Sequence, residues 1–372
     1  MGLSSGEPDH SRHRAAPRRG HHRGKAPPHL CRGTLRRRLA GCLILLLAAV
    51  AAPAGAEPLR IAYWHTELAA DGPGLLLRDI RKGTPRVVKV AARIAELNAD
   101  ILVLGDIDYD HDGAALTALR DAIPDGAARF PHLFAERPNS GIPTGLDLNG
   151  DGRAGAPGDA QGYGRFPGQG GLAVLSRWPL TLTADHSSRL WRNVPDSLLI
   201  DVQGRLGAAA TGADIQRLST VAHWEVAVHL PRGALTLMVF HAAPPVFDGP
   251  EDRNGRRNAD ELSFWRHRLD GAFGPPPEPP FLVVGTANLD PHGGDGRQEV
   301  MRAFLADPRI LDPPGLTDRP TVNWPPPGPG ALRVDYLLPS SGLSVDAAGV
   351  LTADPEASRH HPIWIDLWIG ES

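Results

Sequence analysis

The sequence predicts a layered α/β or α+β domain with two buried sheet faces, and two observations support this. From Leu59 onward, short apolar runs with the length of strands alternate with segments of helical periodicity. The loops between them are dense in Gly and Pro, yet none is long enough to divide the chain, and we find no repeat. Strands alternating with helices pack as layers around a core that a chain of this size can bury.

The predicted strands are apolar runs rich in Val, Ile, Leu and aromatic residues, a composition that favours buried strands. The predicted helices carry apolar residues at helical spacing, most clearly in 87–98. In chain order, the predicted strands are 59–65, 100–106, 171–176, 221–230, 235–241, 280–285, 333–339 and 363–369, and the predicted helices are 87–98, 114–123, 256–270 and 298–306.

The first 56 residues have the layout of a secretory signal peptide. The basic segment 1–38 precedes an apolar run from Leu39 to about Ala52, and the small residues at 54–56 fit a cleavage site. A membrane anchor needs about 20 apolar residues, whereas this run is shorter and ends at Pro53. We therefore expect a signal peptide at 1–56, a domain at 57–372, export to the periplasm or the extracellular space, and no stable membrane anchor after cleavage.

Cleavage after residue 56 would leave an acidic protein without cysteine. Cys31 and Cys42 both lie in the removed part, so stability would come from the core and not from disulfides. Residues 57–372 carry 29 basic and 40 acidic side chains, a net charge of −11. Because an acidic surface repels polyanions, tight nonspecific nucleic-acid binding is disfavoured. We also expect this part of the chain to be a monomer.

Polar residues capable of catalysis recur at the carboxyl ends of the predicted strands. His65, Asp106, His241 and Asn288 lie at or just after four of these ends, and His360 lies just before the last strand. Such residues gather at one edge of a sheet, so the set is a better candidate site than any one member.

Six successive segments resemble the endonuclease/exonuclease/phosphatase superfamily, over essentially all of 57–372. They read LRIAYWH, ILVLGDID, GLAVLSRWP, VFHAAP, GTANLDP, and RVDYLLP followed by ASRHHPIW. The resemblance implies a four-layered α/β sandwich, that is, two packed mixed sheets flanked by helices. It also implies a cation-dependent phosphoesterase in which water attacks a phosphate ester in line. Nucleic acid, phospholipid headgroups and sugar phosphates are all used on this fold, so the resemblance does not identify the substrate.

The resemblance assigns a role to each matching residue. His241 and His360 match histidines that bind the phosphoryl group, and Asn288 matches a residue that positions water or substrate. Asp335 matches the Asp that orients a histidine, and Asp106 takes the place of the metal-binding Glu. The implied cofactor is a divalent cation, Mg²⁺ or Mn²⁺, because hard cations prefer oxygen ligands.

Three positions depart from the family pattern. His65 replaces an Asn, Thr286 replaces the Asp that orients or deprotonates the attacking water, and Arg359 replaces an Asp. Thr286 cannot act as a base, and Arg359 cannot bind a cation but could bind a phosphate oxygen. His65 could bind a softer metal such as Zn²⁺. Two hypotheses follow: a phosphoesterase with an altered site, or a non-catalytic protein that binds a phosphorylated ligand or acts as a scaffold.

Two loops add further candidate residues. Asp147, Asn149 and Asp151 match the first half of a calcium loop, with Asp159 one position beyond the expected Glu. The loop could hold a structural Ca²⁺ or be an ordinary solvated Gly/Asp loop. The segment after His241 makes Arg253 and Asn254 candidates for substrate contact, although charge runs are usually solvated.

Overall fold

The structure is a computed structural model and describes residues 58–199 and 212–369. The expectations for 1–56, including the signal peptide, Cys31 and Cys42, lie outside the described residues. Within the described ranges, no helix has both the length and the apolar character needed to cross a bilayer.

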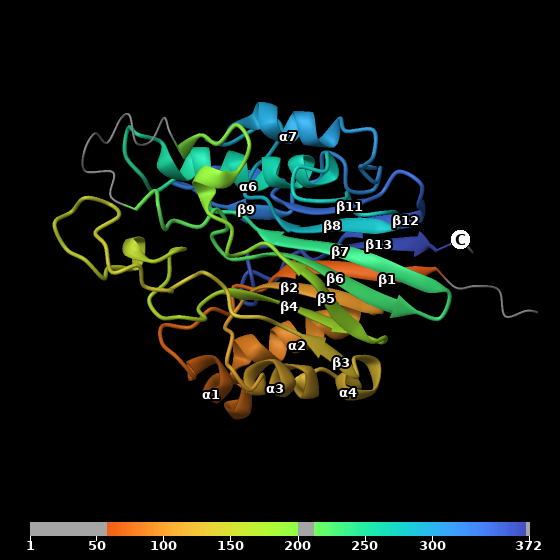
Figure 1. Ribbon diagram of the computed structural model, residues 1–372. Helices are drawn as coiled ribbons and strands as arrows, with labels where there is room; N and C mark the ends of the chain where they lie inside the picture. The colour runs from red at the N-terminus through yellow and green to blue at the C-terminus, as the bar shows by residue number, and fades with distance from the viewer. Residues whose placement is uncertain (1–57, 200–211, 370–372) are drawn as a thin grey trace, which may run out of the picture. The chain divides into compact units, whose positions relative to one another are not determined.

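Two mixed sheets form the centre of the domain (Figure 1). The first has the order β12-β13-β1-β2-β4-β3 and the second β11-β8-β7-β6-β5, and β9 pairs separately with β10. Within the two large sheets, β1 pairs with β2 and β7 with β8 in parallel, while the other neighbours are antiparallel. The strands are β1 Leu59–His65, β2 Ile101–Ile107, β3 His132–Phe134, β4 Gly171–Ser176, β5 Leu180–Asp185, β6 His223–Leu230, β7 Gly233–His241, β8 Phe281–Thr286, β9 Val322–Trp324, β10 Gly330–Leu332, β11 Asp335–Pro339, β12 Ser344–Val350 and β13 Ile363–Trp368.

Helices cover the outer face of each sheet (Figure 1). Helices α1 to α3 pack on the first sheet, with α4 beside α3, and α6 and α7 pack on the second. The predicted four-layered sandwich is therefore confirmed. The helices are α1 Leu75–Lys82, α2 Pro85–Leu97, α3 Ala114–Ala122, α4 Gly126–Arg129, α6 Arg253–Leu269 and α7 Gln298–Leu305.

The alternation of side chains along β1 explains the layers. Ile61 and Tyr63 point into the core between the two sheets, whereas Ala62 and Trp64 pack toward the helices. All four are fully buried, because both faces of the strand are covered. The strands therefore read as nearly continuous apolar runs, which is the pattern that made them visible in the sequence.

All predicted strands and helices are present, and their bounds differ from the prediction by at most three residues. The largest difference is in α6, which begins at Arg253 instead of residue 256. Its first turns bury polar side chains such as Arg257 and Glu261, so apolar periodicity does not mark its start. The sequence pattern did not reveal several elements that are short or lie at a sheet edge, namely α1, α4, β3, β5, β9, β10 and β12.

Candidate active site

The first sheet brings four of the candidate residues together. β1 and β2 are parallel neighbours, so His65 and Asp106 lie at adjacent strand ends. β13 runs antiparallel to β1, and Ile363 at its start pairs with Tyr63. The segment just before β13 therefore returns Arg359 and His360 to the end of β1, where the rings of His65 and His360 stack.

The second sheet contributes the other four residues at the facing edge. β7 and β8 are parallel, and His241 pairs with Thr286 at their carboxyl ends. β11 runs antiparallel to β8 and starts with Asp335 opposite Thr286. Asn288 follows β8 and donates a hydrogen bond from Nδ2 to the carbonyl of Ala242, next to His241, at 2.9 Å.

His65, His241 and His360 form one cluster of imidazole rings. The centroids of His65 and His360 lie 4.1 Å apart with the rings 14° from parallel, and those of His65 and His241 lie 5.1 Å apart at 71°. Burial lowers the pKa of His65 well below its usual range, and the repulsion that protonated His360 and His241 rings would exert lowers it further. Burial also lowers the pKa of His241 to about 4. Both rings are therefore neutral at pH 7.

His65 and His241 also carry unpaired hydrogen-bonding atoms. The Nδ1 atom of each ring is buried and has no hydrogen-bond partner among the described residues. A buried polar atom without a partner costs about 1–3 kcal/mol. Such a cost is typical of a functional site, where a ligand supplies the missing partner.

Asp335 fixes the orientation of His360. Its Oδ2 lies 2.7 Å from Nδ1 of His360, and its Oδ1 accepts a hydrogen bond from the Thr286 hydroxyl at 2.5 Å. Because a carboxylate accepts hydrogen bonds, this contact places the proton of a neutral His360 ring on Nδ1 and leaves Nε2 as an acceptor. Asp335 and His360 are only 1% and 3% exposed, so bulk water does not compete for this bond.

Thr286 is part of a buried hydrogen-bonded chain. Its hydroxyl donates to Asp335 and accepts from the hydroxyl of Tyr63, whose oxygen lies 2.7 Å away. Gly105 makes room for Tyr63, since a Cβ at residue 105 would lie 2.3 Å from the Tyr63 hydroxyl. Thr286 therefore supports Asp335 instead of orienting a reacting water.

Arg359 is held by Glu67, a residue that the sequence pattern did not single out. The Nε and Nη2 atoms of Arg359 both donate to Oε1 of Glu67, the former at 2.8 Å, and the backbone N–H of Arg359 donates to Oε2 at 2.8 Å. Burial alone would raise the pKa of Glu67, but the hydrogen bonds and charge of Arg359 outweigh it and lower that pKa. The available signal was an acidic residue two positions after the end of the first strand.

Asp106 is a carboxylate that ionises near neutral pH. Burial, followed by the charges of Glu67 and Asp108, raises its pKa to about 7. No described residue donates a hydrogen bond to its side chain, which lies 2.6 Å from where a Cβ of Gly170 would be. Gly170 has φ +60° and leaves the space that this carboxylate occupies.

Three residues of the site have left-handed backbone conformations that are rare for side chains larger than Gly. Glu67 has φ 51°, Asp106 has φ 56° and Asn288 has φ 51°. Each such residue costs about 1–3 kcal/mol and persists only where the surroundings hold it. The concentration of these conformations at one edge of the two sheets agrees with a functional site there.

A sequence model of the endonuclease/exonuclease/phosphatase family matches residues 74–360. This chain belongs to that family. No curated protein matches the chain. A family protein from Beutenbergia cavernae is 20% identical over 84% of this chain and 72% of its own, with a TM-score of 0.54. A family protein from Leptotrichia buccalis is 12% identical over 84% of this chain and 100% of its own, with a TM-score of 0.49. Sphingomyelinase C from Streptomyces griseocarneus is 17% identical over 83% of this chain and 99% of its own, with a TM-score of 0.45. At these identities the structural likeness shows the fold alone.

Members of the endonuclease/exonuclease/phosphatase family are metal-dependent phosphoesterases, but the donor set of this chain does not fit a hard cation. Among residues 58–199 and 212–369, no three His, Cys, Asp or Glu side chains are placed to hold a metal ion. Asp106 offers a free carboxylate, but Glu67 is bound by Arg359, and His65 offers nitrogen. The binding of Mg²⁺ or Mn²⁺ at Asp106 thus stays a prediction, and the described residues around Asp106 do not supply a full set of oxygen ligands for it.

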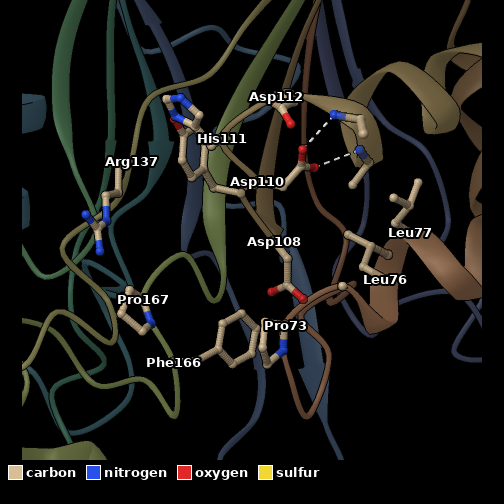
Figure 2. Close-up of a pocket in the computed structure, with 14 residues that line it drawn as sticks. Pro73, Leu76, Leu77, Asp108, Asp110, His111, Asp112, Arg137, Phe166 and Pro167 are labelled. Atoms are coloured by element: carbon tan, nitrogen blue, oxygen red, sulfur yellow. Dashed lines mark hydrogen bonds between the residues drawn. The ribbon is translucent and has the colours of Figure 1, made fainter.

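A cavity of about 530 Å³ begins at Asp108, whose charge acts on Asp106, but neither Asp106 nor the histidine cluster lines it. Asp108 lines the cavity and accepts a hydrogen bond from the backbone of Gly170, the residue beside Asp106. Figure 2 shows the carboxylate of Asp108 near Pro73 and Phe166. The lining combines apolar groups with charges of both signs, among them Leu76, Leu77, Tyr109, Asp110, Asp112 and Arg137.

The remaining candidate residues have other partners. Arg253 donates to the carbonyl of Leu148 and to Oε1 of Gln216, both at 2.8 Å, and Asn254 donates from Nδ2 to the carbonyl of Val246 at 2.7 Å. Arg253 thereby ties α6 to the loop at 147–159. Substrate contact by Arg253 and Asn254 stays a prediction.

The candidate calcium loop is organised by its own carboxylates. Asp147 accepts hydrogen bonds from the backbone of Gly150, Asp151 and Gly152, and Asn149 also accepts from Asp151. Asp159 is 1% exposed and accepts from the backbone of Leu148 and Ala156. Side chains thus bond to this backbone directly, and a structural Ca²⁺ stays a prediction.

Proposed function

We propose that this protein is an exported phosphoesterase that hydrolyses a phosphate ester at the edge shared by the two sheets. One observation carries the proposal: Asp335 orients His360 within a buried cluster that also contains His65 and His241. Membership of a phosphoesterase family supports this choice of reaction. The predicted signal peptide at 1–56 supports export to the periplasm or the extracellular space.

In this proposal His360 is the general base. Its Nε2 takes a proton from the attacking water, and Asp335 stabilises the imidazolium that forms through the bond to Nδ1. His241 and Asn288 donate hydrogen bonds to the non-bridging oxygens of the phosphate. The water oxygen forms a bond to phosphorus, the ester P–O bond breaks, and the alcohol oxygen takes up a proton. Asp106, whose pKa is about 7, is protonated in half of the molecules near neutral pH and can supply that proton.

The proposed substrate is a small ester whose alcohol part is neutral or positively charged. The cavity that begins at Asp108, near Asp106, is large enough for a small organic group, and Asp108, Asp110 and Asp112 add negative charge to its lining. The net charge of −11 for residues 57–372 acts in the same direction. Both features oppose the approach of a polynucleotide, whose phosphates are repelled.

A second candidate function is non-catalytic binding of a phosphorylated ligand. Thr286 favours this alternative, because it stands at the family's base position and its hydroxyl is already bonded to Asp335 and Tyr63. Loss of a general base typically lowers the rate by about 10²–10⁴-fold. Such a protein would keep the phosphoryl-binding histidines and release its ligand unchanged.

The test is hydrolysis of an aryl phosphodiester and an aryl phosphomonoester by the purified protein, with Mg²⁺, Mn²⁺, Ca²⁺, Zn²⁺ or EDTA. His241→Ala should abolish turnover. The control is His223→Ala, which removes a fully buried histidine of β6 that bonds to Ser219 and to the carbonyl of Glu261. Equal loss in both variants would indicate a folding effect and contradict the assignment of His241. Absence of turnover with retained phosphate binding would favour the non-catalytic alternative.

A further inference from the structure

Arg359 supplies a permanent positive charge beside the histidine cluster. Its charge acts on both His65 and Asp106, and the hydrogen bonds that it donates to Glu67 raise its pKa further. The rings of His65 and His241 are neutral at pH 7 and contribute no positive charge. A phosphate ester brings one or two negative charges into this site, so a cation is needed there.

Glu67 orients the guanidinium so that one side of it stays open. The Nε and Nη2 atoms of Arg359 are bound by Oε1 of Glu67, while no described residue accepts a hydrogen bond from Nη1. The Glu67 side chain is 14% exposed and that of Arg359 is 53% exposed. Glu67 therefore serves as the anchor, and Arg359 retains donors for a ligand.

The segment 358–360, which carries Arg359, is itself fixed by neighbouring groups. The Ser358 hydroxyl donates to the carbonyl of His65 at 2.8 Å, and the backbone N–H of His360 donates to Ser358 Oγ at 3.1 Å. Arg359 lies between these two residues, and its own N–H is bound to Glu67. The positions of Arg359 and His360 are thus coupled through one short segment.

We propose that Arg359, positioned by Glu67, replaces the divalent cation of the endonuclease/exonuclease/phosphatase family, so that this chain binds a phosphoryl group without a metal ion. The inference rests on the proposed function, because it assigns a phosphoryl-binding group to that site. A guanidinium suits this role, because its planar donors match two phosphate oxygens and it stays charged at any physiological pH. The positive charge of Arg359 beside Asp106 would repel a metal ion, which agrees with this replacement.

The chain contains a matched ion pair far from the site. Arg177 and Asp100 lie 2.6 Å apart, with side chains 54% and 16% exposed, close to the values for Arg359 and Glu67. Asp100 precedes β2 and Arg177 follows β4, at the end of the sheet opposite to His65. Arg177→Ala therefore removes an equivalent surface ion pair without touching the histidine cluster.

The experiment measures binding of inorganic phosphate and phenyl phosphate to the full chain by calorimetry, in EDTA and then in Mg²⁺ or Mn²⁺. The wild type should bind equally well in both. Arg359→Ala should weaken binding about 10- to 100-fold, the effect of losing charge-assisted hydrogen bonds. Glu67→Gln should weaken it less, because the guanidinium stays but loses its anchor. Arg177→Ala should bind as the wild type does.

Arg359→Asp distinguishes phosphate binding by Arg359 from a merely structural role, because only the former predicts a change in the metal requirement. It restores an oxygen donor next to Asp106 and releases Glu67, so its phosphate binding should require Mg²⁺ or Mn²⁺. Arg359→Lys keeps the charge and should retain part of the metal-independent binding, even if Arg359→Ala fails to fold.

The results distinguish this inference from the proposed function. Phosphate binding in EDTA that depends on Arg359 supports the inference, whether or not an ester is hydrolysed. Binding or hydrolysis by the wild type only with a divalent cation overturns it and leaves the phosphoesterase proposal standing. Equal binding by the wild type and Arg359→Ala in EDTA also overturns it. No binding and no turnover under any condition overturns both.

Discussion

Replacing Asp335 by Asn separates the chemistry of the proposed site from its stability. The Asp335 carboxylate lies 2.7 Å from Nδ1 of His360 and 2.5 Å from the hydroxyl oxygen of Thr286. An Asn side chain has nearly the same shape, and its amide oxygen can still accept from Thr286. Its NH₂ group then faces Nδ1 of His360, which favours the tautomer with the proton on Nε2. His360 in that tautomer cannot accept a proton from water.

The expected change in stability is small. A hydrogen bond to a charged group contributes about 1.5–3 kcal/mol and a neutral one about 0.5–1.5 kcal/mol, so two weakened bonds cost roughly 2–3 kcal/mol. Relief from burying a charge offsets part of this, which leaves a loss below about 2 kcal/mol. By contrast, Asp335→Ala removes the acceptor of the Thr286 hydroxyl and leaves Nδ1 of His360 unpaired, at about 1–3 kcal/mol each, a loss of roughly 2–6 kcal/mol.

The expected change in rate is large. A general base contributes about 10²–10⁴-fold, and the wrong tautomer removes most of that factor. Hydrolysis of an aryl phosphate ester gives kcat, and thermal unfolding gives Tm. The control is Asp366→Asn, since Asp366 is a buried carboxylate that forms two 2.7 Å bonds with Arg60 at the far end of β1. An Asp335→Asn variant with wild-type kcat, or one that loses no more activity than Asp366→Asn, would refute the role of His360 as base.

Three further predictions follow from the same contacts. Thr286→Asp removes the hydroxyl that donates to Asp335 and places a second carboxylate beside this buried one, so both turnover and Tm should fall; a folded variant whose turnover rises about 10²–10⁴-fold would show that the base was missing and contradict the role of His360. In the folded chain the pKa of Asp106 is raised from 3.8 to about 7, so as pH rises this carboxyl ionises first in the unfolded chain. The wild type should therefore lose stability relative to Asp106→Asn between about pH 4 and 7. A difference in Tm that does not change with pH would contradict this prediction. Asp147→Ala removes the acceptor for the backbone N–H groups of residues 150–152 and should lower the free energy of unfolding by about 1–3 kcal/mol, measured by urea denaturation. A rise in Tm on adding Ca²⁺ that occurs only in the wild type would assign an ion to this loop.

The central strands and the main helices could be predicted from local pattern because they are buried on both faces. β1 and β8 read as continuous apolar runs, and α2 places Val87, Val90 and Ile94 on one side. β12 could not be recognised, since it is an edge strand with Ala and Gly in place of β-branched residues. Its pairing with β13 supplies the stability that its own side chains do not.

The family pattern and its departures were readable from the amino-acid sequence, because motif residues follow strands whose apolar character is local. That pattern located His241, Asn288 and His360, and it revealed the exchanges at His65, Thr286 and Arg359. What these exchanges do became clear only from the folded chain, since their partners come from distant segments. Thr286 bonds to Tyr63, 223 residues away, and Arg359 bonds to Glu67, 292 residues away. Sequence spacing carries no information on such contacts; they arise when the two sheets pack and bring their strand ends to one edge.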